Sequence, residues 1–345
     1  MRHGQRLDDG RLLVDNTLLA AEARCQTAAT IRHIYERATL DESVTLVSGQ
    51  AIHKAFETYF KGGSAANALW TFDTFYKPYW ERASKLEDVI RLLGGDAKVA
   101  SDRRSYDNVR LVLSHWFSEH PKVTMPFTTV VDTVEASFEV PLLPDEGIWY
   151  TGTPDIGQVT LDDGSLWAVD HKSTGRMTAE WRRGFRTSGQ VSGYLWGLQQ
   201  VYQRPYTGMF INAVELTKVP GSSRKCSDHG VPYSECGLLH CQSDIFPVQR
   251  TAEELERWKR TAIMLARRYA ERLRAITMVN LNPPGVPITE VLAGVTQEGK
   301  VTGACAYCEH YDFCGSGQAQ WLFDARYQKR EWDPEKRDAT GETDE

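Results

Sequence analysis

The chain has 345 residues, of which 41% are hydrophobic and 25% are charged, and its formal net charge is −6 at pH 7. This composition is typical of a globular protein with one large domain or two ordinary ones. The acidic balance argues against a protein that coats nucleic acid through a generally basic surface, but not against an enzyme whose carboxylates hold metal ions.

Apolar runs and the N-terminal residues indicate in which cellular compartment the protein is expected. No apolar run approaches the length of a membrane span, and the basic start at Met1–Arg6 is followed by acidic residues instead of an apolar stretch. We therefore expect a cytoplasmic protein that does not bind membranes.

Apolar residues in the first third of the chain recur with helical spacing. The first predicted helix begins at Asn16 or Thr17, since either side chain caps a helix well, and Cys25 lies inside it. The predicted helices cover residues 17–40, 49–60, 64–85 and 105–120.

From about residue 121 onward, segments rich in Val, Phe and Thr indicate β-strands. The turn signal Asp162-Asp163-Gly164 joins the second strand to the third. Helices followed by strands with one crossover helix favour a mixed α/β core. The predicted strands cover residues 130–143, 148–161, 166–172, 207–219 and 245–249, and the later predicted helices cover residues 179–201 and 251–278.

The third predicted strand ends in charged residues. Side chains alternate along a strand, so Asp170 and Lys172 point to one side and His171 points to the other. The turn folds the second strand back and brings Asp155 close to Asp170. The sequence therefore predicts two carboxylates and an amine at one end of a sheet.

Such a group suits the hydrolysis of a phosphodiester bond. Carboxylate oxygens are ligands that Mg²⁺ and Mn²⁺ prefer, and the ion activates water and offsets charge on the phosphate. Lys172 orients that water, and the main-chain carbonyl of His171 offers a further oxygen ligand. The ordinary alternative is a surface ion pair between Asp170 and Lys172 on an edge strand. The apolar residues Trp167–Val169, directly before the charges, favour a site at the end of a buried strand.

Four short motifs occur in order along the chain. They resemble those of the RecB-like branch of the PD-(D/E)xK nucleases, which includes CRISPR-adaptation nucleases and phage exonucleases. Each motif alone is weak, but four in order with sensible spacing are specific, and the resemblance runs from about Thr17 to Cys314. The motifs are Gly49-x-x-Ile52-His53, Gly152-Thr153-Pro154-Asp155, Asp170-His171-Lys172 and Gln190-x-x-x-Tyr194.

The resemblance implies a restriction-endonuclease-like fold, in which helices flank a mixed β-sheet core. It implies a metal-dependent deoxyribonuclease, most often an exonuclease, that works in phage or bacterial replication, recombination, repair or CRISPR adaptation. By this resemblance His53, Asp155 and Asp170 bind Mg²⁺ or Mn²⁺, and Lys172 is the catalytic lysine.

The last motif is implied to border the site. Gln190 and Tyr194 are four residues apart and share a helix face, which in the family contacts DNA or the lysine. Taken alone, Gln190 is as readily a solvated helix residue, Tyr194 a core aromatic and His53 a packed or exposed helix residue. Glu135, on the preceding predicted strand, is either an auxiliary acid or, more commonly, a salt-bridge partner.

Seven cysteines in a chain expected to be intracellular argue against a disulfide framework. The C-terminal group Cys305-x-x-Cys308-x5-Cys314 forms, with Cys25, a set of four thiolates that suits zinc or an iron–sulfur cluster. The resemblance implies a [4Fe–4S] cluster that joins the two ends of the nuclease domain. The family often has Pro after the first of these cysteines, whereas Gln26 follows it here. The alternative is a buried Cys25 and a zinc site in which the other three cysteines bind with His310.

A second group of soft ligands lies in a loop between two predicted strands. Either these residues bind zinc or they are ordinary residues of the loop. A zinc site is plausible chemically because an insertion of this length needs a cross-link. His240 competes with the last cysteine for the fourth position. The candidate ligands are Cys226, His229, Cys236 and Cys241.

These motifs divide the chain into four expected parts. Residues 1–120 form a helical part with the first cysteine and the His motif, and residues 121–280 form the nuclease core with a Cys/His-rich insertion at 220–243. Residues 281–317 form a loop-like iron–sulfur segment. Residues 318–345 form a charged tail whose end, after Arg330, is expected to be disordered.

Other classes of function fit the sequence less well. An inactive DNA-binding or assembly module with the same fold is expected to lose an acid or the lysine, and none is lost. A redox enzyme needs a second cofactor motif, such as a glycine-rich dinucleotide fingerprint, which is absent. Because no P-loop is present either, the expected substrate is single-stranded or end-containing DNA, supplied by a helicase, a recombinase or a CRISPR adaptation protein.

Overall fold

A five-stranded mixed sheet forms the centre of the molecule. The computed structural model describes residues 9–39, 44–92, 104–216, 230–231, 243–279, 288–292 and 294–329. In the sheet, β7 and β8 are parallel and all other neighbours are antiparallel. The strand order is β3 (Thr128–Thr129), β6 (Ile156–Thr160), β7 (Leu166–Thr174), β8 (Gly208–Glu215) and β9 (Ser243–Gln249).

A parallel pair needs a crossover connection, and helices α6 (Ala179–Gly184) and α7 (Gly189–Tyr202) provide it between β7 and β8. Ser188 separates the two helices by capping α7, since its hydroxyl accepts a hydrogen bond from the Val191 N–H at 3.4 Å. The crossover thereby leads from the strand that carries the charged motif through α6 to α7.

Two smaller sheets accompany the central one. In the first, β1 (Leu12–Val14) runs parallel to β5 (Ile148–Gly152), which pairs antiparallel with β4 (Phe138–Leu143). In the second, β2 (Arg37–Thr39) pairs with β10 (Tyr327–Lys329), so segments from the two ends of the chain lie side by side.

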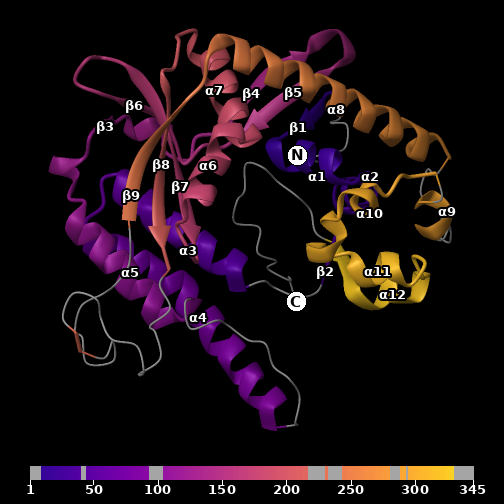
Figure 1. Ribbon diagram of the computed structural model, residues 1–345, viewed down its shortest axis with the longest axis horizontal. Helices are drawn as coiled ribbons and strands as arrows, with labels where there is room; N and C mark the ends of the chain where they lie inside the picture. The colour runs from indigo at the N-terminus through magenta and orange to yellow at the C-terminus, as the bar shows by residue number, and fades with distance from the viewer. Residues whose placement is uncertain are drawn as a thin grey trace.

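Side-chain alternation along β7 divides the interior into two cores. Leu166 and Ala168 pack with apolar residues of α1 (Asn16–Arg24), α7 and α8 (Ala252–Val279), whereas Trp167 and Val169 pack on the opposite side of the sheet. The helices on that opposite side, at the lower left of Figure 1, are α3 (Val44–Phe60), α4 (Ala65–Leu92) and α5 (Tyr106–Glu119).

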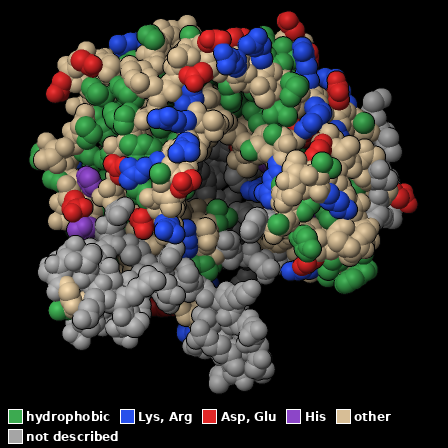
Figure 2. Space-filling model, viewed as in Figure 1, with side chains coloured by type: hydrophobic (Ala, Val, Ile, Leu, Met, Phe, Trp, Pro, Cys, Tyr) green, Lys and Arg blue, Asp and Glu red, His purple; other side chains and the backbone are tan. Residues whose placement is uncertain are grey.

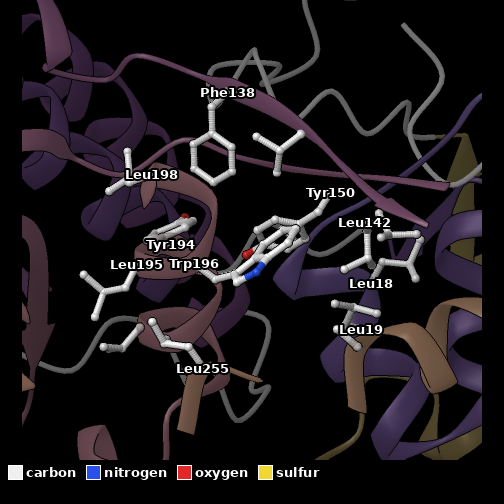
Figure 3. Close-up of a cluster of buried hydrophobic side chains, with 14 of the residues drawn as sticks. Leu18, Leu19, Phe138, Leu142, Tyr150, Tyr194, Leu195, Trp196, Leu198 and Leu255 are labelled. Atoms are coloured by element: carbon white, nitrogen blue, oxygen red, sulfur yellow. The ribbon is translucent and has the colours of Figure 1, made fainter. Parts of the chain in front are cut away.

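The core beneath α7 contains large aromatic residues. Tyr150 of β5 contacts Trp196 of α7 with ring centroids 6.0 Å apart, and Phe138 of β4 contacts Tyr194 at 6.4 Å (Figure 3). These contacts fix α7 on the sheet formed by β1, β5 and β4, next to the end of β7.

The C-terminal segment has a third, smaller core in which Ile31, Phe313 and Phe323 are buried. Figure 1 shows this segment beside α1 and α2 (Gln26–Ala29). Its helices are α9 (Ile288–Leu292), α10 (Glu298–Thr302), α11 (Tyr311–Gly315) and α12 (Gln320–Arg326). The prediction that residues 282–317 are loop-like is therefore wrong for the described part of that range.

The first predicted helix is also wrong as a single element. Asp15, and neither Asn16 nor Thr17, caps it by accepting a hydrogen bond from the Leu18 N–H at 2.7 Å. The helix ends at Arg24, because Cys25 has an extended backbone with φ −169° and ψ 121° before α2 begins. Residues 30–34 then form a π-helical turn, and residues 37–39 are strand β2.

Two predicted strands are interrupted. The strand expected over 130–143 is broken at Glu135, whose φ is +55°, and only β4 remains as a regular strand within it. The strand expected over 148–161 is two strands, β5 and β6, that belong to different sheets. The loop from 220 to 242, except residues 230–231, and the tail from residue 330 lie outside the described residues. None of the helices in the described part of the chain is long and apolar enough to cross a membrane.

Candidate active site

The antiparallel pairing of β6 and β7 brings the two predicted acids together. Ile156 pairs with Val169, so Asp155, directly before β6, lies opposite Asp170. Gly164 makes the connecting turn with φ +78°, a conformation that other residues rarely adopt. Each acid is only 1% exposed, so two carboxylates lie close together in the interior.

Asp155 is held by groups on both sides of it. Its Oδ1 lies 2.7 Å from Nδ1 of His53 on α3, and its Oδ2 accepts a hydrogen bond of 2.5 Å from the main-chain N–H of His171. His53 is 26% exposed, so its ring reaches from the protein surface to the buried acid. Helix α3 thereby contributes one side of the site and β7 the other.

Asp170 and Lys172 point to the same side of β7, and Lys172 Nζ lies 2.5 Å from Asp170 Oδ2. Burial raises the pKa of Asp170, and the neighbouring charge of Asp155 raises it further, although Lys172 lowers it. For Lys172, burial lowers the pKa, but the charges of Asp170 and Asp155 outweigh burial and raise it. The lysine is therefore positively charged, and at 27% exposure it also reaches solvent.

Glu135 is a further acid that lies beside His53 and Asp155. Its main-chain N–H donates a 3.0 Å hydrogen bond to the Asp155 carbonyl, and its left-handed backbone turns the chain there. Ligand atoms of Glu135, His53 and Asp155 all lie within 4.8 Å of one another. Among the described residues these three make the one such group, so Glu135 belongs to the site itself.

The side chain of His171 points away from the acids, as predicted, and is buried. Its ring stacks on Phe60 of α3 at 5.3 Å, and its Nδ1 lies 2.9 Å from Nδ2 of Asn212 on β8. The Asn212 Oδ1 accepts a hydrogen bond from the Trp116 indole N–H, so the amide NH₂ faces His171 and donates to its Nδ1. This chain of hydrogen bonds fixes the backbone of β7 between Asp170 and Lys172.

Helix α7 places the last motif beside the same site. The Gln190 Nε2 donates a hydrogen bond of 3.3 Å to the Tyr194 hydroxyl, and Tyr194 is close enough to Lys172 to contribute to its raised pKa. Gly152 of the G-x-x-D motif is required for this packing, since a Cβ there would lie 2.7 Å from the Tyr194 ring. The structure thus brings Gln190 and Tyr194 to the edge of the acidic pair.

The donor set fits a hard divalent cation. Both Asp170 carboxylate oxygens are buried without a donor in hydrogen-bonding geometry, although the Lys172 ammonium pairs with one of them. Carboxylate oxygens with one imidazole are ligands that Mg²⁺ and Mn²⁺ accept. The two buried carboxylates carry more negative charge than Lys172 alone offsets. A bound cation would compensate the remainder, because burial of an uncompensated charge is costly.

The four cysteines of the predicted cluster come together at a separate place. Cys25, Cys305, Cys308 and Cys314 line one cavity of about 230 Å³ between the α1–α2 junction and the C-terminal segment. All four are free thiols. Burial raises the pKa of Cys314 to about 11, and the other three cysteines add to the effect.

The second group of soft ligands, Cys226, His229, Cys236, His240 and Cys241, lies outside the described residues. His310, the alternative zinc ligand, is 2% exposed, and its Nδ1 lies 2.9 Å from the Tyr327 hydroxyl.

Sequence reasoning underrated Glu135 and did not find Asn212. The left-handed backbone that turns Glu135 into the site arises from tertiary structure and leaves no local signal. Asn212, in contrast, is a polar residue inside the apolar strand Gly208–Glu215, and a buried polar residue in such a strand signals a specific hydrogen-bond role.

One comparison with known proteins, the match to a family model, agrees with this geometry. A family model described as the PD-(D/E)XK nuclease superfamily matches residues 17–315. No curated protein matches the chain. Among solved structures, the chain is similar to one from Eubacterium rectale named "Putative exonuclease", with 12% sequence identity and a TM-score of 0.43 over 82% of this chain and 93% of that one. The family match covers most of the chain and includes all four motifs, so the chain belongs to the PD-(D/E)XK nuclease superfamily.

Proposed function

We propose that the protein is a Mg²⁺- or Mn²⁺-dependent deoxyribonuclease that removes nucleotides from the ends of DNA. The observation that carries this proposal is the buried pair Asp155 and Asp170, with the Lys172 ammonium 2.5 Å from Asp170 Oδ2. A surface ion pair, the ordinary alternative for Asp170 and Lys172, does not bury its acid to 1% exposure.

Asp155, His53 and Glu135, whose ligand atoms lie within 4.8 Å of one another, would hold the ion. Asp170, opposite Asp155 on β7, and the His171 carbonyl would be its further ligands. When bound, it acts as a Lewis acid that activates water and offsets negative charge on the phosphate. The hydrogen bond from the His171 N–H to Asp155 keeps one carboxylate in place for this task.

Lys172 acts on the water and the phosphate as a fixed positive charge. Its ammonium lies 2.5 Å from Asp170 Oδ2 and also reaches solvent, so it is placed to donate hydrogen bonds to a water or a phosphate oxygen at the acids. Donors that point to developing negative charge in a partly buried site stabilise the transition state strongly. The Gln190 amide and the Tyr194 hydroxyl, hydrogen-bonded to each other, border the phosphate position and orient the DNA strand.

Action from DNA ends is tested with end-labelled linear DNA and closed circular DNA, each incubated with Mg²⁺ or Mn²⁺. We expect the linear DNA to be degraded stepwise and the closed circle to persist, with the label position giving the polarity. Cleavage of the closed circle at the same rate contradicts an exonuclease and identifies an endonuclease. We further propose that a helicase, recombinase or CRISPR adaptation protein supplies the end.

We propose that Cys25, Cys305, Cys308 and Cys314, which line one cavity, bind a [4Fe–4S] cluster. Cys25 is held against the C-terminal segment, since the Gln26 N–H donates to Glu298 and the Thr27 N–H donates to the Thr296 carbonyl. All four cysteines line the same cavity, which is the arrangement that one shared cluster requires.

We also propose that Cys226, His229, Cys236 and Cys241 bind zinc. A variant in which Cys25 and the three C-terminal cysteines are changed to Ser is expected to retain about one zinc per chain, because a closed tetrahedral site is independent of the cluster. Metal analysis after chelator-free purification measures it, and adding Cys236→Ser and Cys241→Ser to that variant is the control that removes the zinc. If the variant that lacks only the four cluster cysteines contains no zinc, Cys226, His229, Cys236 and Cys241 are ordinary loop residues.

A further inference from the structure

A groove lined by four arginines lies beside the edge strand β9. It has a volume of about 650 Å³, and its walls are α6 with the turn that follows it, β9, and the start of α8. In a chain whose net charge is −6, this concentration of positive charge is a local feature. Lys and Arg side chains gather over this face in Figure 2. The arginines are Arg182, Arg183, Arg186 and Arg250.

Two of the arginines hold the walls of the groove together. Arg182 makes an ion pair with Asp244 of β9, and its guanidinium lies 5.4 Å from the centroid of the Phe246 ring. Arg250 donates hydrogen bonds to the Phe185 carbonyl at 2.7 Å and to the Ser192 hydroxyl at 2.9 Å. These two side chains therefore connect α6, α7 and β9.

The other two arginines, Arg183 and Arg186, have no such structural task. Both are exposed, and in the part of the chain that the structure describes neither makes an ion pair or a hydrogen bond. The acid that lines the groove, Glu254, is used as a helix cap, since it accepts a hydrogen bond from the Thr251 N–H at 2.7 Å. The groove therefore presents two free guanidinium groups to an anionic ligand.

Strand register relates the groove to the catalytic centre. Asp170 pairs with Ile211, which pairs with Phe246, a residue of the groove. Neighbouring strands are about 4.8 Å apart, so the groove begins about 10 Å from the catalytic strand. In addition, the segment that carries Arg183 and Arg186 directly connects β7 to α7. A DNA strand bound at the acids spans this distance within one or two nucleotides.

We propose that this groove binds the sugar–phosphate backbone of the DNA strand that extends from the catalytic centre, with Arg183 and Arg186 as the phosphate contacts. Guanidinium groups suit phosphate because their donors match its oxygens in bidentate geometry. The inference rests on the proposed nuclease function, and it adds the path of the substrate.

The test compares the double variant Arg183→Gln, Arg186→Gln with the matched control Arg204→Gln, Arg274→Gln. The control removes the same charge from two exposed arginines, at the far end of α7 and late in α8. Binding of a labelled single-stranded oligonucleotide is measured in EDTA as a function of salt concentration. Hydrolysis of a dinucleotide and of a long oligonucleotide is measured with Mg²⁺.

For the groove variant we expect weaker binding and a salt dependence of log K that is shallower by about 1.4, since each phosphate contact on a single strand contributes about 0.7. KM should rise for the long oligonucleotide, whereas dinucleotide hydrolysis and the control variant should match the wild type. If the groove variant binds DNA as tightly as the wild type and with the same salt dependence, the groove does not bind the DNA strand. Cleavage by that variant still supports the proposed nuclease function. Failure of the wild type to hydrolyse any DNA contradicts both the nuclease function and the proposed strand path. If the groove variant loses hydrolysis of the dinucleotide and of the long oligonucleotide equally, the two arginines maintain the catalytic centre and do not bind the extending strand.

Discussion

Changing Asp170 to Asn should reduce the rate of DNA hydrolysis by at least about 10³-fold, because a metal ligand that supports several kcal/mol of Lewis acid stabilisation is lost. The same change should leave the fold intact and raise the melting temperature measured in EDTA. Burial beside Asp155 raises the pKa of the Asp170 carboxyl, so a neutral amide of the same shape removes an unfavourable buried charge. Calorimetric titration with Mn²⁺ should show weakened binding.

Changing Lys172 to Ala should separate catalysis from metal binding. The expected loss in kcat is about 10²–10³-fold, as for the removal of one preorganised donor, with Mn²⁺ binding retained. Lys61→Ala is the matched control, since Lys61 also pairs with a carboxylate, Glu57, but on the surface. Wild-type rates in either the Asp170 or the Lys172 variant show that the centre lies elsewhere.

Changing Cys25 to Ser should remove the brown colour of protein purified without oxygen, together with its iron and sulfide. Cys25 and Cys305 are separated by about 280 residues, and a cross-link that closes so long a loop stabilises a protein by on the order of 5 kcal/mol in chain-entropy models. A clear fall in melting temperature is therefore expected, and cleavage should fall indirectly with it.

Cys226→Ser is the control for the cluster, because Cys226 belongs to the proposed zinc group, and this variant should remain brown. Anaerobic wild-type protein that is colourless and contains only zinc contradicts the cluster. It leaves the nuclease assignment intact, since Asp155, Asp170 and Lys172 lie at a different place from the cysteine cavity.

The central part of the site was predictable because strand periodicity and turn chemistry are local. Alternation along β7 places Asp170 and Lys172 together, and the turn at Gly164 folds β6 back onto β7. A register shift between Ile156 and Val159, which has no signal in the sequence, then brings Asp155 opposite Asp170. The mixed α/β fold was predictable for the same reason, since the crossover helices and strands carry clear apolar patterns.

The errors arose where distant parts of the chain override local preference. The residues around Cys25 favour a continuous helix, but the Gln26 N–H is capped by Glu298, from the other end of the chain, and the helix restarts there. Glu135 has a left-handed backbone at the point where its N–H donates a hydrogen bond to the Asp155 carbonyl. Neither partner is visible from the neighbouring sequence.

The most direct test of the proposed centre is the release of nucleotides from linear DNA by the wild type and by Asp170→Asn, each with Mn²⁺ and with EDTA. The account predicts release only by the wild type with Mn²⁺. Release by the wild type in EDTA, or equal release by the Asp170 variant with Mn²⁺, contradicts a metal-dependent centre at Asp155, Asp170 and Lys172.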